Sequence, residues 1–78
     1  MTIIVWSQNR CIYCDQAKAL LETKGMAYEE RNINQDFTKQ QLLEAVPSAR
    51  TVPQIIIDGI CIGGMIDLQL YLKEKNID

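Results

Sequence analysis

The sequence predicts a single α/β domain in which one mixed, four-stranded sheet packs against three helices. Short β-branched runs alternate with longer stretches whose apolar residues recur at helical spacing, and this alternation is typical of strands joined by helices. The last two predicted strands are instead joined by a two-residue turn, which makes them an antiparallel hairpin. The 78 residues, 47% hydrophobic and 23% charged, suit one domain, assigned to residues 1–78.

The first half of the chain is predicted to form a strand, a helix and a second strand. Residues 2–6 predict a buried strand because the run is short and rich in β-branched side chains. A polar loop over residues 7–10 leads into a helix over residues 12–24, whose apolar positions share one face. Gly25 is suited to end that helix, and residues 27–33 alternate loosely as a second strand. A helix-sized connection implies that the two strands are parallel, with a right-handed crossover.

The second half is predicted to add a helix, a hairpin and a last helix. Leu42, Leu43 and Val46 form the apolar side of the helix. Asp58-Gly59 is a hairpin turn dipeptide, and Gly63-Gly64 ends the strand that follows it. In chain order, the expected elements are a turn at 34–36, a helix over 37–46, strands over 54–57 and 60–62, and a helix over 65–75.

Charge and hydropathy exclude several classes of function. Eight basic and ten acidic residues give a net charge of −2, and no basic run occurs, which disfavours nucleic-acid binding. No apolar run approaches the roughly 20 residues of a membrane span, and the first residues lack the basic segment that opens a secretory signal. We therefore expect a cytoplasmic protein that binds neither nucleic acid nor membrane, and we expect it to be a monomer.

Two cysteines follow the first predicted strand and open the first predicted helix. Residues i and i+3 share a helix face, so the sulfurs of Cys11 and Cys14 can meet. Cys11 is placed where unpaired backbone N–H groups and the helix dipole favour an anion. Such a setting lowers a thiol pKa from about 8.5 toward roughly 3.5–7.5, and Arg10 adds positive charge. We predict a dithiol redox pair, with Cys11 as nucleophile and Cys14 as resolving thiol.

Other interpretations of the cysteines are weaker. A closed zinc site needs about four Cys or His ligands, and the chain has three Cys and no His. A disulfide framework fits poorly, because the cysteine number is odd and the Cys11–Cys14 loop closes too few residues to stabilise a domain. Chance pairing of two core cysteines stays open. Cys61, in the predicted hairpin, is interpreted as a small buried hydrophobe, with a regulatory thiol as the alternative.

Three separated segments resemble the glutaredoxin family of the thioredoxin fold. Their order and spacing match the family along essentially the whole chain. They are Cys11-Ile12-Tyr13-Cys14, Thr51-Val52-Pro53 and Gly63-Gly64-Met65-Ile66-Asp67. Tyr13 matches the tyrosine before the second cysteine of dithiol glutaredoxins. The chain departs from the family at Ile12, where proline is usual, and at Met65-Ile66, where Cys or Ser followed by Asp or Ser is commoner.

The resemblance implies a thioredoxin-like fold and a glutathione-dependent thiol–disulfide oxidoreductase. Glutathione would be a co-substrate, and no tightly bound cofactor or metal is implied. Cys11 would attack a target disulfide, and Cys14 would then release the reduced target. The implied substrates are protein disulfides and glutathione mixed disulfides, with ribonucleotide reductase as a candidate protein target.

The resemblance also implies a glutathione site built from all three segments. From the residues alone Pro53 is an ordinary trans proline at the start of a strand, whereas the resemblance implies a cis bond opposite Cys11. The Val52 backbone would pair with the cysteine of glutathione as an added strand does. The γ-glutamyl carboxylate would bind the N-terminus of the last helix, where Asp67 either holds the ammonium group or only stabilises the helix. The implied contacts are Tyr13, Thr51, Val52, Pro53, Gly64, Met65, Ile66 and Asp67, with Gln8, Arg10 or Arg50 at the glycine carboxylate.

Three other functions stay open beside this one. A related redoxin would take electrons from thioredoxin reductase, ignore glutathione and donate to ribonucleotide reductase; the segment 63–67 favours glutathione instead. Some glutaredoxins bridge a [2Fe–2S] cluster between two chains through the first cysteine and glutathione, so a cluster carrier is the second alternative. A structural interaction module would retain its function in a Cys11→Ser variant. Trp6 and Tyr71 are expected to pack in the core or on the surface, away from the site.

Overall fold

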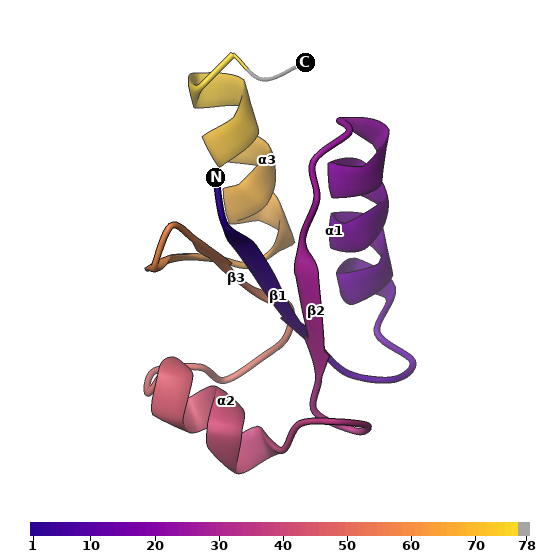
Figure 1. The fold of residues 1–78 in the computed structure, drawn as a ribbon, viewed down its shortest axis with the longest axis vertical. Coiled ribbons are helices and arrows are strands. Elements are labelled where there is room, and N and C mark those ends of the chain that lie inside the picture. The colour runs from indigo at the N-terminus through magenta and orange to yellow at the C-terminus, as the bar shows by residue number, and fades with distance from the viewer. Residues whose placement is uncertain (77–78) are drawn as a thin grey trace.

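The computed structural model describes residues 1–76 and has the predicted element order (Figure 1). The elements are β1 (Ile3–Ser7), α1 (Ile12–Thr23), β2 (Glu29–Asn32), α2 (Lys39–Ala45), β3 (Gln54–Ile57), β4 (Ile60–Gly63) and α3 (Met65–Glu74). The sheet order is β2-β1-β3-β4, with β1 parallel to β2 and antiparallel to β3, and β4 antiparallel to β3. These pairings confirm the mixed sheet, the parallel βαβ unit and the hairpin. Within residues 1–76, no helix has the length and apolar character needed to cross a membrane.

Side chains of the central strands alternate between two hydrophobic clusters, one on each face of the sheet, as the two-residue period of a strand requires. The first cluster joins β1 and β3 to α1 and α3, and half-buried Tyr71 packs against it; its buried members are Ile3, Val5, Ala17, Leu21, Ile55, Ile57, Leu68 and Leu72. The second cluster places Trp6 of β1 against Leu42 and Val46. Two helices therefore cover one face, and α2 covers the other, apart from them in Figure 1. The packing roles predicted for Trp6 and Tyr71 are confirmed.

The helix α2 begins later than predicted because the chain caps it at Thr38. The Thr38 hydroxyl oxygen accepts the Gln41 N–H at 3.1 Å, and the Gln41 side-chain oxygen accepts the Thr38 N–H at 2.8 Å. This reciprocal pair satisfies two backbone donors that a helix start leaves open. The predicted helix over 37–46 is therefore shorter in the structure, at Lys39–Ala45. The predicted strand over 27–33 is also shorter, at Glu29–Asn32.

Cys61 is exposed, so the prediction that it is a small buried hydrophobe is wrong. It lies on β4, an edge strand that pairs only with β3, and it stands opposite Ile56. Ile56 belongs to the α2 face of the sheet, whereas β4 is covered by α3 on the opposite face. The apolar run of the hairpin therefore does not bury Cys61, whose sulfur instead contacts the Gln54 side-chain oxygen at 3.6 Å.

Candidate active site

Cys11 caps the N-terminus of α1, and its sulfur accepts a backbone hydrogen bond from the first turn. The backbone of Cys11 is extended, with φ −117° and ψ 103°, and the Cys14 N–H donates to its sulfur at 3.1 Å. The Asp15 N–H donates to the Cys11 carbonyl oxygen at 3.0 Å. Cys11 thus holds the position where a helix start stabilises an anion.

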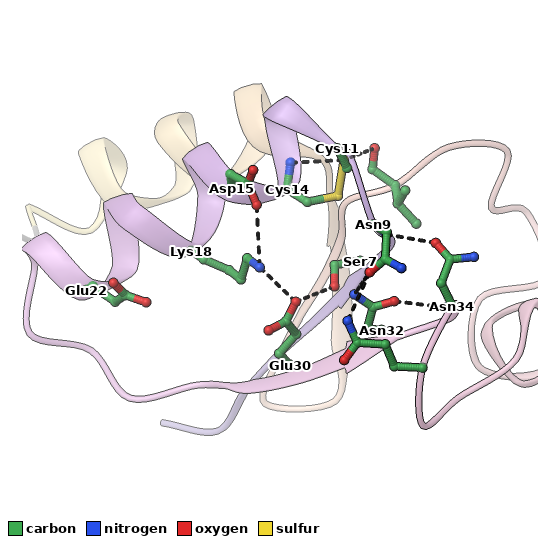
Figure 2. A network of polar contacts seen from close by, with 12 residues as sticks. Ser7, Asn9, Cys11, Cys14, Asp15, Lys18, Glu22, Glu30, Asn32 and Asn34 are labelled. Carbon is green, nitrogen blue, oxygen red and sulfur yellow. Dashed lines mark hydrogen bonds and ion pairs between the residues drawn. A yellow bond between two sulfur atoms is a disulfide. The ribbon is translucent and has the colours of Figure 1, made fainter.

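The two cysteines form a disulfide, with their Cα atoms 5.2 Å apart (Figure 2). Cys11 is 9% exposed and Cys14 is fully buried at 0%. Cys11 is therefore the more accessible cysteine of the pair, and Cys14 is the buried one.

The segment 51–53 lies directly against Cys11. The Cys11 sulfur is 3.8 Å from the carbonyl oxygen of Val52, and the Val52–Pro53 peptide bond is cis, as the resemblance implied. The N-terminus of α3 approaches the same segment from the other side, because a Cβ atom on Gly64 would lie 3.5 Å from the Pro53 carbonyl oxygen. Three segments separate in sequence, at Cys11, Val52-Pro53 and Gly64, thus meet in space.

The start of α3 depends on glycine and on a carboxylate cap. Gly63 has φ +115°, a conformation that L side chains rarely adopt, and a Cβ atom there would collide with the Asp67 carboxylate. The Gly64 N–H donates to Asp67 Oδ2 at 3.0 Å. Asp67 therefore stabilises the helix start, and the residue is exposed. Ile66, beside it, is 70% exposed.

A cleft of about 860 Å³ opens beside Cys11, between the α1 start, the segment 49–52 and α2. It brings together predicted site residues from separate parts of the chain: Gln8, Arg10, Cys11, Tyr13, Arg50, Thr51 and Val52. Buried Pro53, the N-cap residue Gly64 and the α3 residues Met65, Ile66 and Asp67 do not line it. The cleft therefore meets one part of the predicted site, and the α3 N-terminus lies on the other side of Pro53.

Amide side chains tie the loop before Cys11 to the loop after β2. The Asn9 side-chain oxygen accepts from Asn32 at 3.1 Å and from Gln35 at 2.9 Å. The Asn9 backbone N–H donates to Asn34 Oδ1 at 2.8 Å. These contacts, several of which Figure 2 shows, fix the turn in which Arg10 adopts a left-handed φ of 55° immediately before Cys11.

A second polar network lies beneath α1, one turn along the helix from Cys14 (Figure 2). The fully buried Ser7 hydroxyl donates to Glu30 Oε2 at 2.7 Å, and Lys18 Nζ donates to the same oxygen at 2.8 Å. The Lys18 hydrogen bond, followed by that of Ser7, lowers the pKa of Glu30, and the Glu30 hydrogen bond raises the pKa of Lys18. The Lys18 side chain is only 22% exposed and bridges α1 to β2.

The α2 wall of the cleft was not predicted from the sequence. Ile33, Lys39, Leu42, Leu43 and Ala49 line it, but only Leu42 and Leu43 were singled out, and both as core. Leu43 is 37% exposed. Leu42, Leu43 and Val46 together span about 100° of a helical wheel, which is the width of an ordinary apolar face, so the spacing gives no signal that Leu43 is a surface residue. Within residues 1–76, no three Cys, Asp or Glu side chains gather as a metal-ligand set.

The whole sequence and the whole fold are similar to those of known glutaredoxins. The family model described as Glutaredoxin matches residues 3–62. Glutaredoxin 1 of Rickettsia conorii is 41% identical over 80 residues, covering 99% of this chain and 78% of that protein. The structure of reduced Escherichia coli glutaredoxin superposes with a TM-score of 0.80 at 31% identity, covering 97% of this chain and 98% of that one. A buckwheat glutaredoxin–glutathione complex gives a TM-score of 0.79 at 28% identity, covering 96% of this chain and 71% of that one.

These comparisons agree with the geometry of the cysteine pair. The disulfide lies at the N-terminus of α1 and faces the cis-proline segment. Nearly the whole chain matches proteins named glutaredoxin. A pair that opens and closes by thiol–disulfide exchange is the chemistry that the two sulfurs offer. The chain belongs to the glutaredoxin family, and it is a thiol–disulfide oxidoreductase.

Proposed function

We propose that this glutaredoxin takes its electrons from glutathione and reduces protein disulfides and glutathione mixed disulfides through Cys11 and Cys14. The observation that carries the proposal is the position of the Cys11 sulfur, between the Cys14 N–H and the Val52 carbonyl at the edge of the cleft. The buckwheat relative was solved as a glutaredoxin–glutathione complex in the same fold, which supports the choice of co-substrate.

Reduction of a target begins at Cys11. Its thiolate attacks one sulfur of the target disulfide, the target S–S bond breaks, and the departing thiolate takes a proton from solvent. Cys14 then loses its proton and attacks the Cys11 sulfur. The second target thiolate leaves, and the two electrons of the dithiol have passed to the target as the Cys11–Cys14 disulfide closes.

Two glutathione molecules return the pair to the dithiol. The first glutathione thiolate attacks the Cys11 sulfur, which forms a Cys11–glutathione mixed disulfide and frees Cys14. The second attacks the sulfur of the bound glutathione, so that oxidised glutathione leaves and the Cys11 thiolate is regenerated. Potentials of glutaredoxins, roughly −200 to −230 mV, lie near those of glutathione pools, so the exchange runs in either direction.

The proposed binding mode places the cysteine of glutathione along the Val52 backbone, where free peptide groups pair with an added strand. Tyr13 and Thr51 flank this position, and Arg10 or Arg50 of the cleft, or Gln8 as an amide donor, receives the glycine carboxylate. The γ-glutamyl end crosses Pro53 to the α3 start at Gly64, where the N–H groups of Met65 and Ile66 receive its carboxylate. Oδ1 of the exposed Asp67 holds the ammonium group while Oδ2 keeps its cap.

The test is steady-state reduction of a mixed disulfide between glutathione and a small thiol, with glutathione and glutathione reductase as the coupled electron source. Turnover that depends on glutathione is the expected result. A protein that is inert with glutathione but is reduced by thioredoxin reductase would refute the proposed co-substrate and favour a glutathione-independent redoxin. A protein that gains visible absorbance only on anaerobic reconstitution with iron and sulfide, and shows no turnover, would point to a [2Fe–2S] carrier.

A further inference from the structure

The free edge of β4 is an uncharged part of the surface. Among residues 1–76, β4 pairs only with β3, so its other side offers unpaired backbone groups. No charged side chain occurs between Asp58 and Asp67 in the sequence. Ile60 is 69% exposed on this edge, and Cys61 is exposed as well. An apolar edge of this kind is a template for pairing with the strand of another chain.

The opposite edge of the sheet is protected by charges. It is formed by β2, which carries Glu29, Glu30 and Arg31. Arg31 pairs with Glu29, and Lys18 of α1 pairs with Glu30. A strand that approached β2 would have to face these charges, which is a common way to prevent pairing at an edge. Of the two edges, β4 is therefore the one open to a further strand.

The turn before β4 determines which backbone groups point to the free side. Asp58 and Gly59 have φ of 51° and 84°, and two positive φ values in a two-residue turn are typical of a type I′ hairpin. In such a hairpin the residue after the turn directs its N–H toward the preceding strand, and Ile60 holds that position, opposite Ile57. Backbone groups alternate along a strand, so Cys61 directs its N–H and C=O away from β3.

An antiparallel copy of β4, centred on Cys61, matches this edge. The two Cys61 residues would then form a hydrogen-bonded pair and exchange both N–H···O bonds. Ile60 would face the partner's Ile62. Ile57 and Ile62 pack in the first cluster, so the exposed Ile60 side chain, opposite Ile57, lies on the α3 face and would be covered there by an apolar neighbour.

A second copy of the chain suits this edge better than a charged partner. The chain as a whole has a net charge of −2, so most pairs of surfaces on two copies repel each other weakly. Between Asp58 and Asp67 this repulsion is smallest, and an acidic or basic peptide finds no complementary charge there. An antiparallel strand pair has two-fold symmetry, so one patch serves both subunits and each contact forms twice.

We propose that two copies of this chain pair through β4, with the strands antiparallel and centred on Cys61, so that their sheets form one continuous sheet. The pairing uses neither Cys11 nor glutathione, so it is independent of the proposed function.

The pairing is expected to be weak because the regular part of the edge is short. Cys61 is opposite Ile56 and Gly63 is opposite Ile55, so β4 contains one extra residue and bends there as a β-bulge. A short edge buries less than the roughly 1,200 Å² at which stable interfaces begin. We expect a dissociation constant of about 0.1–1 mM, so that dilute protein is the monomer expected from the sequence.

The test is sedimentation equilibrium of the protein from about 20 μM to about 2 mM. The weight-average mass should rise from the 8.9 kDa of one chain toward twice that value. Over the same range, proton–nitrogen NMR spectra should show shifts of the amides of residues 59–63 and none for those of Glu29–Asn32. A Cys61→Ser variant should associate as wild type does, because the pairing depends on backbone groups.

A lysine on the edge locates the interface. Ile60→Lys is expected to raise the dissociation constant at least about tenfold, because it removes the apolar pair and adds two like charges to the dimer. Ile60 is 69% exposed, so the variant keeps its fold. Leu70→Lys is the matched control, since Leu70 is 53% exposed on the side of α3 opposite the buried Leu68 and Leu72. Its dissociation constant should equal that of wild type.

Several results would overturn the inference. A mass that stays at one chain up to about 2 mM would exclude the dimer at the expected strength. A dimer that Ile60→Lys leaves unchanged, or that Leu70→Lys weakens equally, would place the interface elsewhere. A dimer that is lost in Cys61→Ser would be due to an intermolecular disulfide, not to strand pairing.

Discussion

Replacing Cys11 with serine is expected to reduce turnover of every disulfide substrate to the uncatalysed rate. A serine hydroxyl neither ionises at neutral pH nor forms a disulfide, so the first bond of the exchange is never made. Replacing Cys14 with serine should give a different result. That variant still forms the Cys11–glutathione intermediate, so it keeps part of its activity on glutathione mixed disulfides and loses the intramolecular step that reduces protein disulfides.

Both variants are measured beside wild type on two substrates: the mixed disulfide of glutathione and a small thiol, and a peptide with an intramolecular disulfide. The fold of each variant is checked by circular dichroism, because Cys11 and Cys14 are both buried. The role assignment would be reversed if Cys14→Ser were the inactive variant and Cys11→Ser retained turnover. Retention of activity by both variants would favour a structural role for the pair.

Trp6→Ala is expected to produce the largest loss of stability among single substitutions. Trp6 is 1% exposed, its ring centroid lies 5.4 Å from that of Phe37, and the Arg31 guanidinium lies 5.3 Å from both rings. Truncating a buried aromatic residue costs about 3–5 kcal/mol. A domain of this size has roughly 4–12 kcal/mol in total. In urea unfolding, the midpoint concentration of the variant should be far below that of wild type, or the variant should be largely unfolded before urea is added.

Trp6→Phe is the matched control for this prediction. Among the described residues, the buried Trp6 Nε1 has no hydrogen-bond partner, so phenylalanine loses no bond and keeps an aromatic ring against Phe37. The control should retain most of the stability of wild type. A Trp6→Ala midpoint within error of wild type would contradict the account of the second cluster. The cleft residues Leu42 and Val52 pack in that cluster, so Trp6→Ala should also weaken substrate binding.

The order of elements and the active cysteines were predictable because local patterns specify them. The β-branched run before Cys11, the helical spacing after it and the Asp58-Gly59 turn each act over a few residues. The pairing of β1 with β2 followed from the length of the connection. The meeting of Cys11, Val52 and Gly64 did not follow from any local pattern, and it was predicted only through the resemblance to glutaredoxins.

The errors have one cause, which is that exposure depends on the neighbouring elements. Cys61 lies in an apolar run, but its strand is at the edge of the sheet and its side chain is on the face opposite α3, the helix that contacts β4. Lys18 is a charged residue of the kind usually found in solvent, yet β2 places Glu30 under it. The α2 wall of the cleft was missed for the same reason, since only the packed fold shows that Leu43 lines the cleft.

The central claim is that the start of α1 lowers the pKa of the Cys11 thiol, and the direct measurement is the pH dependence of its alkylation. A Cys14→Ser variant is treated with iodoacetamide across the pH range, and modification of Cys11 is followed by mass spectrometry of the digested protein. Exposed Cys61, which caps no helix, is followed in the same samples as the reference thiol. The Cys14 backbone nitrogen lies 3.1 Å from the Cys11 sulfur at the helix N-terminus, and the serine of the variant keeps that N–H. The pKa of Cys11 should therefore fall between roughly 3.5 and 7.5. An alkylation midpoint near about 8.5, the value of a free thiol, would contradict the claim.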